Sequence, residues 1–409
     1  MGQYVSIEDI YAAYKDCRRN KRNSEGAMRY ELDYEGNNYR LWKELNNMTY
    51  KPTTSVTFCV TRPKIREVFA ANFRDRVVHH LIIRRWLESI EAEMIDASYN
   101  CRKGKGTLYG VRDIAEKIRR VSEEWTKETY VLKFDIQGFF MSIDKEKMCA
   151  QIGRIIDRDY DGRREEEQRQ WWQWLTRTVA MHRPEQNCEK RGDITLWNKL
   201  PRNKSLFHTN GKGMAIGNLT SQVFANLYLS DFDKWMIVRT GGNYGRLTDD
   251  CVASGTDKAA LLRLLEEARA YLRDELGLTL HPNKVYLQEA RKGLPFVGYV
   301  IKPHRIYTQN RTVGYMAAMI EEWNRDKRPD TKRYVCRYNS YMGFLRHSAS
   351  YAIRWQMWNK IRNKEGIYSI NHKYIRQNDF HKSKKRKLPR GRRARRRQVR
   401  GACLPHYAK

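Results

Sequence analysis

Apolar residues recur every three or four positions over much of the chain, and this spacing predicts amphipathic helices. One helix is expected to begin after a cap at Thr256 or Asp257 and to end at Gly277. The other helical regions are 7–47 with a polar loop at 18–26, 74–95, 114–125 and 312–362. In the last region one stripe indicates core packing rather than a platform for stacking bases; it contains Tyr334, Tyr338, Tyr341 and Leu345.

Shorter runs of β-branched and aromatic residues lie between these helices and predict strands. They are 55–60, 130–134, a hairpin at 245–254, 285–288 and 295–301. From 130 to 301 the order is strand, helix, hairpin, helix, strand, which indicates an α+β sandwich.

The net charge of the chain indicates which class of molecule it binds. The 409 residues include 79 Lys and Arg against 47 Asp and Glu, a net charge of +32, and 41% are apolar, enough for a sizeable core. We find no apolar run that resembles a membrane span or a signal segment, so we expect nucleic acid, ahead of a membrane surface, as the polyanionic partner. Residues 382–400 hold 12 basic residues and no acidic one, which predicts a solvated basic tail.

The eight cysteines are scattered singly, without Cys-x-x-Cys spacing and without a histidine pair at zinc spacing. We therefore expect reduced thiols, a cytoplasmic protein and no structural zinc.

Three carboxylates stand where strands are expected to end. Asp135 follows an apolar run, and burying its charge is costly unless it stays hydrated or binds a cation. Asp249 and Asp250 are adjacent at the apex of the hairpin, where a divalent cation would offset their repulsion. A solvated turn is the alternative for this pair, whereas phosphoryl transfer with two hard cations needs such a cluster. Asp144 is expected to cap a helix that starts at Lys145.

Several motifs occur in the order found in the palm of reverse transcriptases, and the chain resembles that superfamily. The motifs are 134–140 (FDIQGFF), 217–229 (GNLTSQVFANLYL), the Asp249-Asp250 pair and 296–299 (FVGY). Within the superfamily the chain is most similar, over about 7–362, to the reverse transcriptases of diversity-generating retroelements. The segments that carry this finer resemblance are 62–71 (RPKIREVFAA), 73–80 (FRDRVVHH), 98–107 (SYNCRKGKGT) and 203–207 (NKSLF).

The resemblance implies a catalytic role for four side chains. Asp135, Asp249 and Asp250 would be the metal ligands, together with the backbone carbonyl of Ile136. Lys284 would protonate the leaving pyrophosphate.

The resemblance also implies residues that bind the nucleotide and the primer. Phe140 would block a ribose 2′-hydroxyl and so select deoxynucleotides, with core packing as its alternative. Lys64 and Arg66 resemble the cations that hold a triphosphate, and Arg62 is an alternative that spacing alone does not decide. The remaining nucleotide-binding positions are Ile136, Ile216, Gly217 and Gln222, and the primer grip is Phe296 and Gly298.

Two positions depart from the common pattern of the superfamily. Leu247 stands where most reverse transcriptases have Tyr, which removes a contact to the primer end and leaves the metal ligands intact. Ala215-Ile216-Gly217 stands where many relatives have Pro-Gln-Gly. An apolar residue at this place is a feature of the subgroup and is associated with error-prone copying of template adenines. The alternative is that Ile216 only packs behind the Gly217 turn.

The resemblance implies an RNA-directed DNA polymerase that makes error-prone cDNA from a template-repeat RNA, with errors directed at adenine, and so diversifies a target gene. It implies two Mg²⁺ ions, for which Mn²⁺ can substitute, and dNTP substrates. The implied partners are a structured template RNA, the cDNA and an oligomeric accessory variability protein, without a membrane, in the cytoplasm of a bacterial, phage or archaeal host.

Two alternatives stay open: a defence-associated or group II intron-like reverse transcriptase, and a non-catalytic RNA-binding module with a polymerase fold. The 47 residues after Arg362 are too few for the maturation or endonuclease domain of a group II maturase. Against a decayed enzyme stands an intact set of ligands and cations, namely Asp135, Asp249, Asp250, Lys64, Arg66 and Lys284.

The expected fold class is α+β with the right-hand architecture of polymerases. Fingers occupy 1–130, a palm with an antiparallel sheet of ferredoxin-like type occupies 131–304, a helical thumb 305–365 and a basic tail 366–409. A polar insertion at about 157–211 interrupts the palm, and its tryptophans are expected to be packed; they are Trp171, Trp172, Trp174 and Trp197. The basic density of the tail suits contacts to RNA phosphates through Lys384, Lys385, Arg386, Lys387, Arg392, Arg393, Arg395, Arg396 and Arg397.

Overall fold

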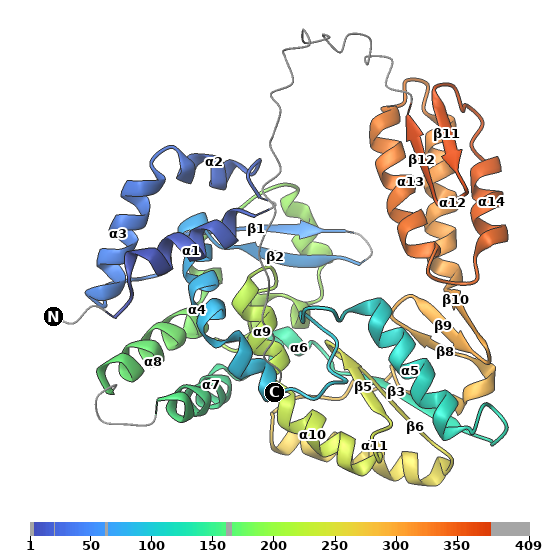
Figure 1. Cartoon of the computed structure of the whole chain (residues 1–409), viewed down its shortest axis with the longest axis horizontal. Coiled ribbons are helices and arrows are strands. Elements are labelled where there is room, and N and C mark those ends of the chain that lie inside the picture. Colours follow the sequence, from blue (N-terminus) through green and yellow to red (C-terminus); the bar gives the residue numbers. More distant parts are fainter. Residues whose placement is uncertain (1–3, 20, 62–63, 161–165, 378–409) are drawn as a thin grey trace, which may run out of the picture. The chain divides into compact units, whose positions relative to one another are not determined.

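A computed structural model describes residues 4–19, 21–61, 64–160 and 166–377. The chain divides into two compact units, Met1–Val313 with His347–Ser350, and Gly314–Arg346 with Tyr351–Lys409. Both units combine helices with small sheets, so the predicted α+β class is confirmed (Figure 1). Arg62 and the predicted RNA-binding residues of the tail, 384–397, lie outside the described residues.

The first unit begins with helices, as the periodicity predicted. Helix α4 packs against α1 and α9 and is buried along most of its length, with Trp86 and Val77 fully enclosed. Ser6 and Asp9 form a capping box at the start of α1. The bounds are α1 (Ile7–Arg18), α2 (Glu25–Glu31), α3 (Tyr34–Asn46), α4 (Phe73–Ala92) and α9 (Leu219–Tyr228).

A three-stranded sheet follows the first helices, in the order β2-β1-β4. Strand β1 (Ser55–Val60) has the predicted bounds and pairs antiparallel with β2 (Arg66–Ala70). The sequence analysis did not predict β2, in which Arg66 and Glu67 interrupt the apolar pattern. Strand β4 (Cys188–Lys190) adds in parallel to β1.

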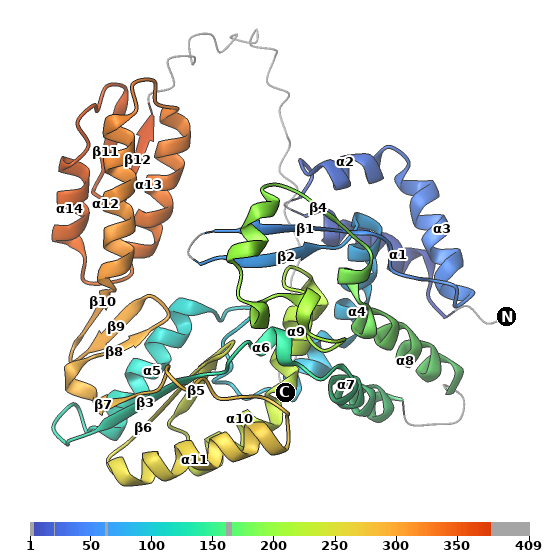
Figure 2. The ribbon, with the colours of Figure 1, turned by 180° about the vertical axis from the view of Figure 1, so that it is seen from behind.

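The central sheet of the first unit is antiparallel and has the order β5-β6-β3-β7. It confirms the predicted hairpin and the strands on either side of it. Asp257 caps α11, which decides between the two candidate caps. Helices α10 and α11 lie side by side along the sheet (Figures 1 and 2). The bounds are β3 (Tyr130–Asp135), β5 (Tyr244–Leu247), β6 (Asp250–Gly255), β7 (Tyr286–Glu289), α10 (Ser230–Arg239) and α11 (Lys258–Asp274).

Two predicted elements have clearly different bounds in the structure. The helix expected at 114–125 is α5 (Thr107–Val121), because Glu123, Glu124 and Trp125 all have positive φ and cannot continue a helix. The single strand expected at 295–301 is two strands, β8 (Leu294–Phe296) and β9 (Tyr299–Lys302), because Val297 and Gly298 form a tight turn with φ of 39° and 93°. Strand β10 (Arg305–Thr308) pairs with β9.

The predicted insertion is packed over 166–181, whereas most residues of 189–204 are exposed. Asp144 caps α7 (Lys145–Asp159) as expected, accepting from the backbone N–H groups of Glu146 and Lys147. Helix α8 (Glu166–Met181) packs against α7. The predicted burial of the tryptophans is confirmed for the main core, where Trp171 is 0% and Trp172 is 5% exposed; Trp174 is partly buried against this core and Trp197 is partly exposed.

Within its described residues, up to 377, the second unit contains three helices and a hairpin. The predicted stripe is core at Tyr334, Tyr338 and Leu345, which are buried, whereas Tyr341 is half-buried. Tyr334 stacks on Trp323 at 5.3 Å between ring centroids. Residues 367–377, assigned to the tail by sequence, form the hairpin β11–β12, and Asn339 bonds to both backbone groups of Ile375. The bounds are α12 (Asn310–Arg325), which starts in the first unit, α13 (Thr331–Leu345), α14 (Tyr351–Asn359), β11 (Ile367–Ile370) and β12 (Tyr374–Gln377).

The seven cysteines in the described residues are all free thiols. Among the same residues, no helix has both the length and the apolar character that crossing a membrane requires.

Candidate active site

The register of the central sheet brings two of the three predicted carboxylates together. Asp135, at the end of β3, lies directly opposite Asp250, at the start of β6. Directly opposed residues on antiparallel strands project from the same face, so the two carboxylates share a face of the sheet. Leu247 of β5 is paired with Asp250 and lies on that face too. Asp135 is 8% exposed, and so its charge needs a compensating partner.

Asp249 lies in the two-residue turn between β5 and β6. The turn begins at Thr248, whose φ of 61° is in the left-handed region that β-branched residues rarely adopt. The N–H of Ile136 donates to the carbonyl oxygen of Asp249 at 3.2 Å, which ties the turn to the end of β3. Burial, followed by the negative charges of Asp135 and Asp250, raises the pKa of Asp249 to about 6. The three carboxylates therefore act on one another electrostatically.

Two lysines offset part of this negative charge. Nζ of Lys284 donates to Oδ2 of Asp135 at 2.8 Å, and Nζ of Lys133 lies 3.0 Å from Oδ1 of Asp250. With these ion pairs in place, no group of three or more His, Cys, Asp or Glu side chains in the described part of the chain is arranged to hold a metal ion. The donor chemistry nevertheless fits Mg²⁺, which prefers carboxylate oxygens. A divalent cation would also offset the charges of Asp135 and Asp250, which add to the effect of burial in raising the pKa of Asp249.

The loop before α9 is fastened to strand β2. The N–H of Phe69 donates to the carbonyl oxygen of Ile216 at 2.8 Å, and the N–H of Ala71 donates to Oδ1 of Asn218 at 3.2 Å. Gly217 has a φ of 124°, and a Cβ added to it would lie 2.5 Å from the carbonyl oxygen of Phe69. Only glycine allows this close approach, which fixes the backbone of Ile216.

Phe140 and Ile216 border the same small apolar cluster, and both are partly buried against it. Phe140 also packs against the main core and meets Phe139 edge to face, with 5.6 Å between ring centroids. Each keeps an exposed portion. The buried members of the cluster are Phe69, Met141, Leu206 and Ala215.

Lys64 and Arg66, the predicted triphosphate cations, are exposed around the start of β2. Partial burial lowers the pKa of Lys64, and neighbouring positive charges lower it further. These charges are, in decreasing order, Lys284, Arg311 and Lys204. Cations from distant parts of the sequence thus act on one region, which also feels the charge of Asp135. Such a concentration of positive charge suits a polyphosphate.

The insertion segment that carries Lys204 is held on β2 by Glu67. Glu67 is 1% exposed, and its Oε2 accepts from Nε1 of Trp197 at 2.8 Å. The carbonyl oxygen of Asn203 lies 2.9 Å from where a Cβ of Gly138 would be, so this segment reaches the motif that follows Asp135. Two further donors to Glu67 are the hydroxyl of Ser205 and the N–H of Leu206.

The other predicted site residues are Gln222, Phe296 and Gly298, and each is described by its own contacts. Oε1 of Gln222, on α9, accepts from Sγ of Cys101 at 3.0 Å. Phe296 is 0% exposed, so its side chain is core and contacts no primer in this conformation. A primer grip here would therefore consist of the backbone of the turn that contains Gly298.

Several charged side chains in and around the site were not predicted from the sequence. They are Arg246, Asp233, Lys133, Glu67 and Lys204. In a chain this basic, a charged residue is normally expected to lie on the protein surface. The one sequence signal to the contrary is that Arg246 lies two positions after Tyr244 in β5, so both side chains project from the same face of the strand, and that face is buried.

Comparison with known proteins agrees with this geometry. A family model described as reverse transcriptase (RNA-dependent DNA polymerase) matches residues 51–301, more than half of the chain. No curated protein matches the chain.

Solved telomerase structures are similar at low identity. Apo telomerase from Candida tropicalis has a TM-score of 0.46 and 10% identity, covering 76% of this chain and 57% of its own. A form of that enzyme truncated from its C-terminal domain has a TM-score of 0.45 and 12% identity, covering 63% and 55%. Telomerase from Candida albicans, in complex with a fragment of telomeric RNA, has a TM-score of 0.41 and 10% identity, covering 76% and 56%. The chain thus spans a little over half the length of these telomerases.

The family match covers the carboxylates, the loop before α9 and most of the cations described above. The chain belongs to the reverse transcriptase family.

Proposed function

We propose that the chain is an active RNA-directed DNA polymerase whose catalytic centre is formed by Asp135, Asp249 and Asp250. The observation that carries this proposal is the register that sets Asp135 opposite Asp250, with Asp249 in the adjoining turn. Two carboxylates held by the backbone ladder of one sheet, with a third in the adjoining turn, are a suitable binding site for hard divalent cations.

Two Mg²⁺ ions would be held by the three carboxylates and the backbone carbonyl of Ile136, with Mn²⁺ able to substitute. Bound there, the ions would activate the primer 3′-hydroxyl and stabilise the leaving pyrophosphate. Release of Lys284 from Asp135 would free a carboxylate oxygen for a ligand and the ammonium group for the pyrophosphate, to which it would give a proton.

The incoming dNTP would be bound by cations and selected by side-chain shape. Lys64 and Arg66 would hold the triphosphate, supported by the positive charge of Lys204. Phe140 would clash with a ribose 2′-hydroxyl, and Gly217 with Gln222 would line the nucleotide side of α9. The turn of Phe296 and Gly298 would support the primer.

The proposed architecture is the right hand of polymerases, with fingers in 1–130, a palm in 131–304, an insertion at about 157–211 and a thumb in 305–365. The basic residues of 384–397 would contact RNA phosphates without reading sequence.

We further propose that the enzyme copies a template-repeat RNA with errors at adenine, as the polymerase of a diversity-generating retroelement. Ile216 supports this subtype, because it occupies the place of a glutamine in many relatives and its backbone is fixed by Phe69 and Gly217. Isoleucine has no donor or acceptor to align the nucleotide with the template base, so correct and incorrect nucleotides would differ less in transition-state binding. An oligomeric accessory protein and a structured RNA would be its partners.

One assay tests both the proposed polymerase activity and the proposed retroelement subtype. Purified full-length protein should extend a DNA primer on an RNA template with dNTPs and Mg²⁺, and sequenced products should carry substitutions concentrated opposite adenine. Ile216→Gln should reduce these substitutions by about tenfold for each 1.4 kcal/mol of discrimination regained. Extension with an unchanged error spectrum in an active Ile216→Gln enzyme would refute the subtype and leave the polymerase intact.

A further inference from the structure

A fully buried arginine, Arg246, belongs to strand β5, which leads to the turn of Thr248 and Asp249. Arg246 of β5 and Asp233 of α10 are both 0% exposed. Nε of Arg246 lies 2.8 Å from Oδ1 of Asp233, and Nη2 lies 2.5 Å from Oδ2, which is a bidentate pair. Arg246 is paired in register with Cys251, so it projects from the face of the sheet opposite to Asp250.

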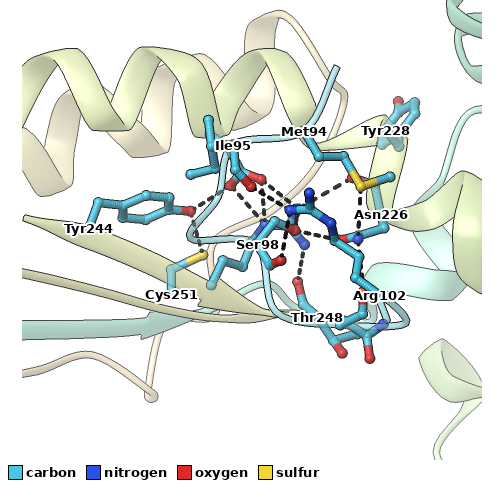
Figure 3. A network of polar contacts seen from close by, with 12 residues as sticks. Met94, Ile95, Ser98, Arg102, Asn226, Tyr228, Tyr244, Thr248 and Cys251 are labelled. Carbon is cyan, nitrogen blue, oxygen red and sulfur yellow. Dashed lines mark hydrogen bonds and ion pairs between the residues drawn. The ribbon is translucent and has the colours of Figure 1, made fainter. Parts of the chain in front are cut away.

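The hydroxyl of Tyr244 adds a third bond to the same carboxylate. It lies 2.8 Å from Oδ1 of Asp233 and contacts Sγ of Cys251 (Figure 3). Asp233 thus has its oxygens occupied from two side chains of β5, and the guanidinium group of Arg246 is locked in one orientation.

The remaining donors of Arg246 reach three other segments. Nη1 donates to the carbonyl oxygen of Thr248 at 2.8 Å, and Nη2 lies 3.3 Å from the carbonyl oxygen of Asn226 and from Oγ of Ser98. Figure 3 shows Ser98, Asn226 and Thr248 converging on this point. The bond to Thr248 is the one that touches the turn before Asp249 and Asp250.

That turn needs support because its backbone is strained. Thr248 is β-branched and has a φ of 61°, a position for which turns of this kind favour glycine. A strained residue persists only where its surroundings determine its conformation. Here the carbonyl oxygen of Thr248 is held by Arg246, and the carbonyl oxygen of Asp249 is held by the N–H of Ile136.

We propose that Arg246, locked by Asp233, is a positioning residue that holds the Thr248 turn so that Asp249 and Asp250 face the divalent cations. A buried ion pair by itself adds little to stability, and apolar residues of similar volume often replace it without loss. The bond to the Thr248 carbonyl is what an apolar replacement could not supply. This inference rests on the proposed function, because it concerns the same carboxylates.

Two variants of the full chain test the proposal. Arg246→Lys keeps the charge opposite Asp233 but cannot hold both Asp233 and Thr248. The double variant Arg246→Met with Asp233→Leu removes both charges, so that no charge is left unpaired and folding is retained. Tyr244→Phe is the matched control, because it removes a buried hydrogen bond to Asp233 and leaves the bond to Thr248 in place.

The readout is Mn²⁺ binding, measured by electron paramagnetic resonance on enzyme bound to a primer–template that ends in a dideoxynucleotide. Loss of a group that orients metal ligands typically weakens metal affinity by about 10- to 100-fold, and we expect this in both Arg246 variants. Tyr244→Phe should bind Mn²⁺ as the native enzyme does, even where its melting temperature falls. Adding Thr248→Gly should restore part of the affinity of Arg246→Lys, because glycine adopts positive φ without strain.

The outcomes separate this inference from the proposed function. Native enzyme that neither extends a primer nor binds Mn²⁺ contradicts the proposed function itself. Native enzyme that does both, together with unchanged Mn²⁺ affinity in either folded Arg246 variant, overturns the positioning role alone. An equal loss in Tyr244→Phe would also overturn it, because the effect would then follow stability rather than the bond to Thr248.

Discussion

Asp135 and Asp250 are paired directly across strands β3 and β6, so the backbone hydrogen bonds of the sheet determine where these carboxylates meet. A shift of one residue in this register would send one of them to the opposite face. The same ladder places Lys133 on the carboxylate face, where it bonds to Asp250. The candidate site is therefore a property of sheet register, and the charged side chains around it come from strands β3 and β5, helix α10, the segment before β7 and the insertion.

Lys204 should matter for nucleotide binding although it lies in the insertion. We expect Lys204→Ala to raise the KM for dNTP roughly tenfold, in line with ~1.4 kcal/mol for one lost charge-assisted contact, with little change in RNA affinity. Steady-state primer extension measures this effect. Lys199→Ala is the control, because it removes one positive charge from the same insertion. Lys199 is not among the main charges that lower the pKa of Lys64. Equal KM values in the two variants would exclude Lys204 from the triphosphate site.

The stability of the protein should fall in mild acid because of a buried histidine. Burial is the main reason why the pKa of His79 is lowered to about 4, with His80 and His182 adding to it and Asp75 opposing it. Between pH 6.5 and 4 the unfolded chain binds this proton first, so the contribution of neutral His79 is complete above pH 6.5 and is lost as the pH falls. At pH 5 the loss is about 2 kcal/mol.

Denaturant unfolding at pH 7 and pH 5 checks this prediction. His79→Gln cannot take up the proton and should lose less stability between the two values than the native protein. His208→Gln, at an exposed histidine, serves as the control. An identical pH dependence in native and His79→Gln protein would show that His79 contributes nothing to it.

The basic tail should contribute to RNA affinity through counterion release. Replacing the nine basic residues predicted to bind RNA in 384–397 with glutamine should weaken RNA binding and flatten the dependence of log K on log salt, because each lost phosphate contact removes about one unit of slope. Filter binding over a range of salt concentrations measures both quantities, with a scrambled tail of native composition as control. A native salt slope in the glutamine variant would rule out phosphate contacts from the tail.

Structural features that depend on neighbouring residues could be predicted from the sequence. Features that depend on contacts between residues far apart in the chain could not. The bounds of β1, a cap at Thr256 or Asp257 and the hairpin before α11 follow from local patterns and were predicted from the sequence; the structure then selects Asp257 as the cap. Strand β2 was missed because its pairing with β1, rather than its own composition, makes it a strand. The split at Val297 and Gly298 was missed because an apolar residue at positive φ leaves no compositional signal.

The candidate site was likewise predictable from the sequence only in part. The three carboxylates could be singled out from the sequence because an acidic residue at the end of an apolar strand and an Asp pair at a hairpin apex are conspicuous, and because they match a motif of reverse transcriptases; their catalytic role stays a prediction. Arg246 and Asp233 were not, because their pairing joins β5 to α10 and is visible only after folding. Burial of Phe296 likewise could not be separated from a primer contact by sequence alone.

The most direct measurement of the central claim is primer extension on an RNA template by Asp249→Asn and Asp250→Asn enzymes beside Asp144→Asn. Asparagine keeps the shape of aspartate and removes the charge that would hold the cations, so both active-site variants should lose extension by several orders of magnitude while RNA affinity stays native. Asp144→Asn should extend normally, because asparagine caps a helix as well as aspartate does. Robust extension by either folded active-site variant would contradict the assignment of these carboxylates as the catalytic centre.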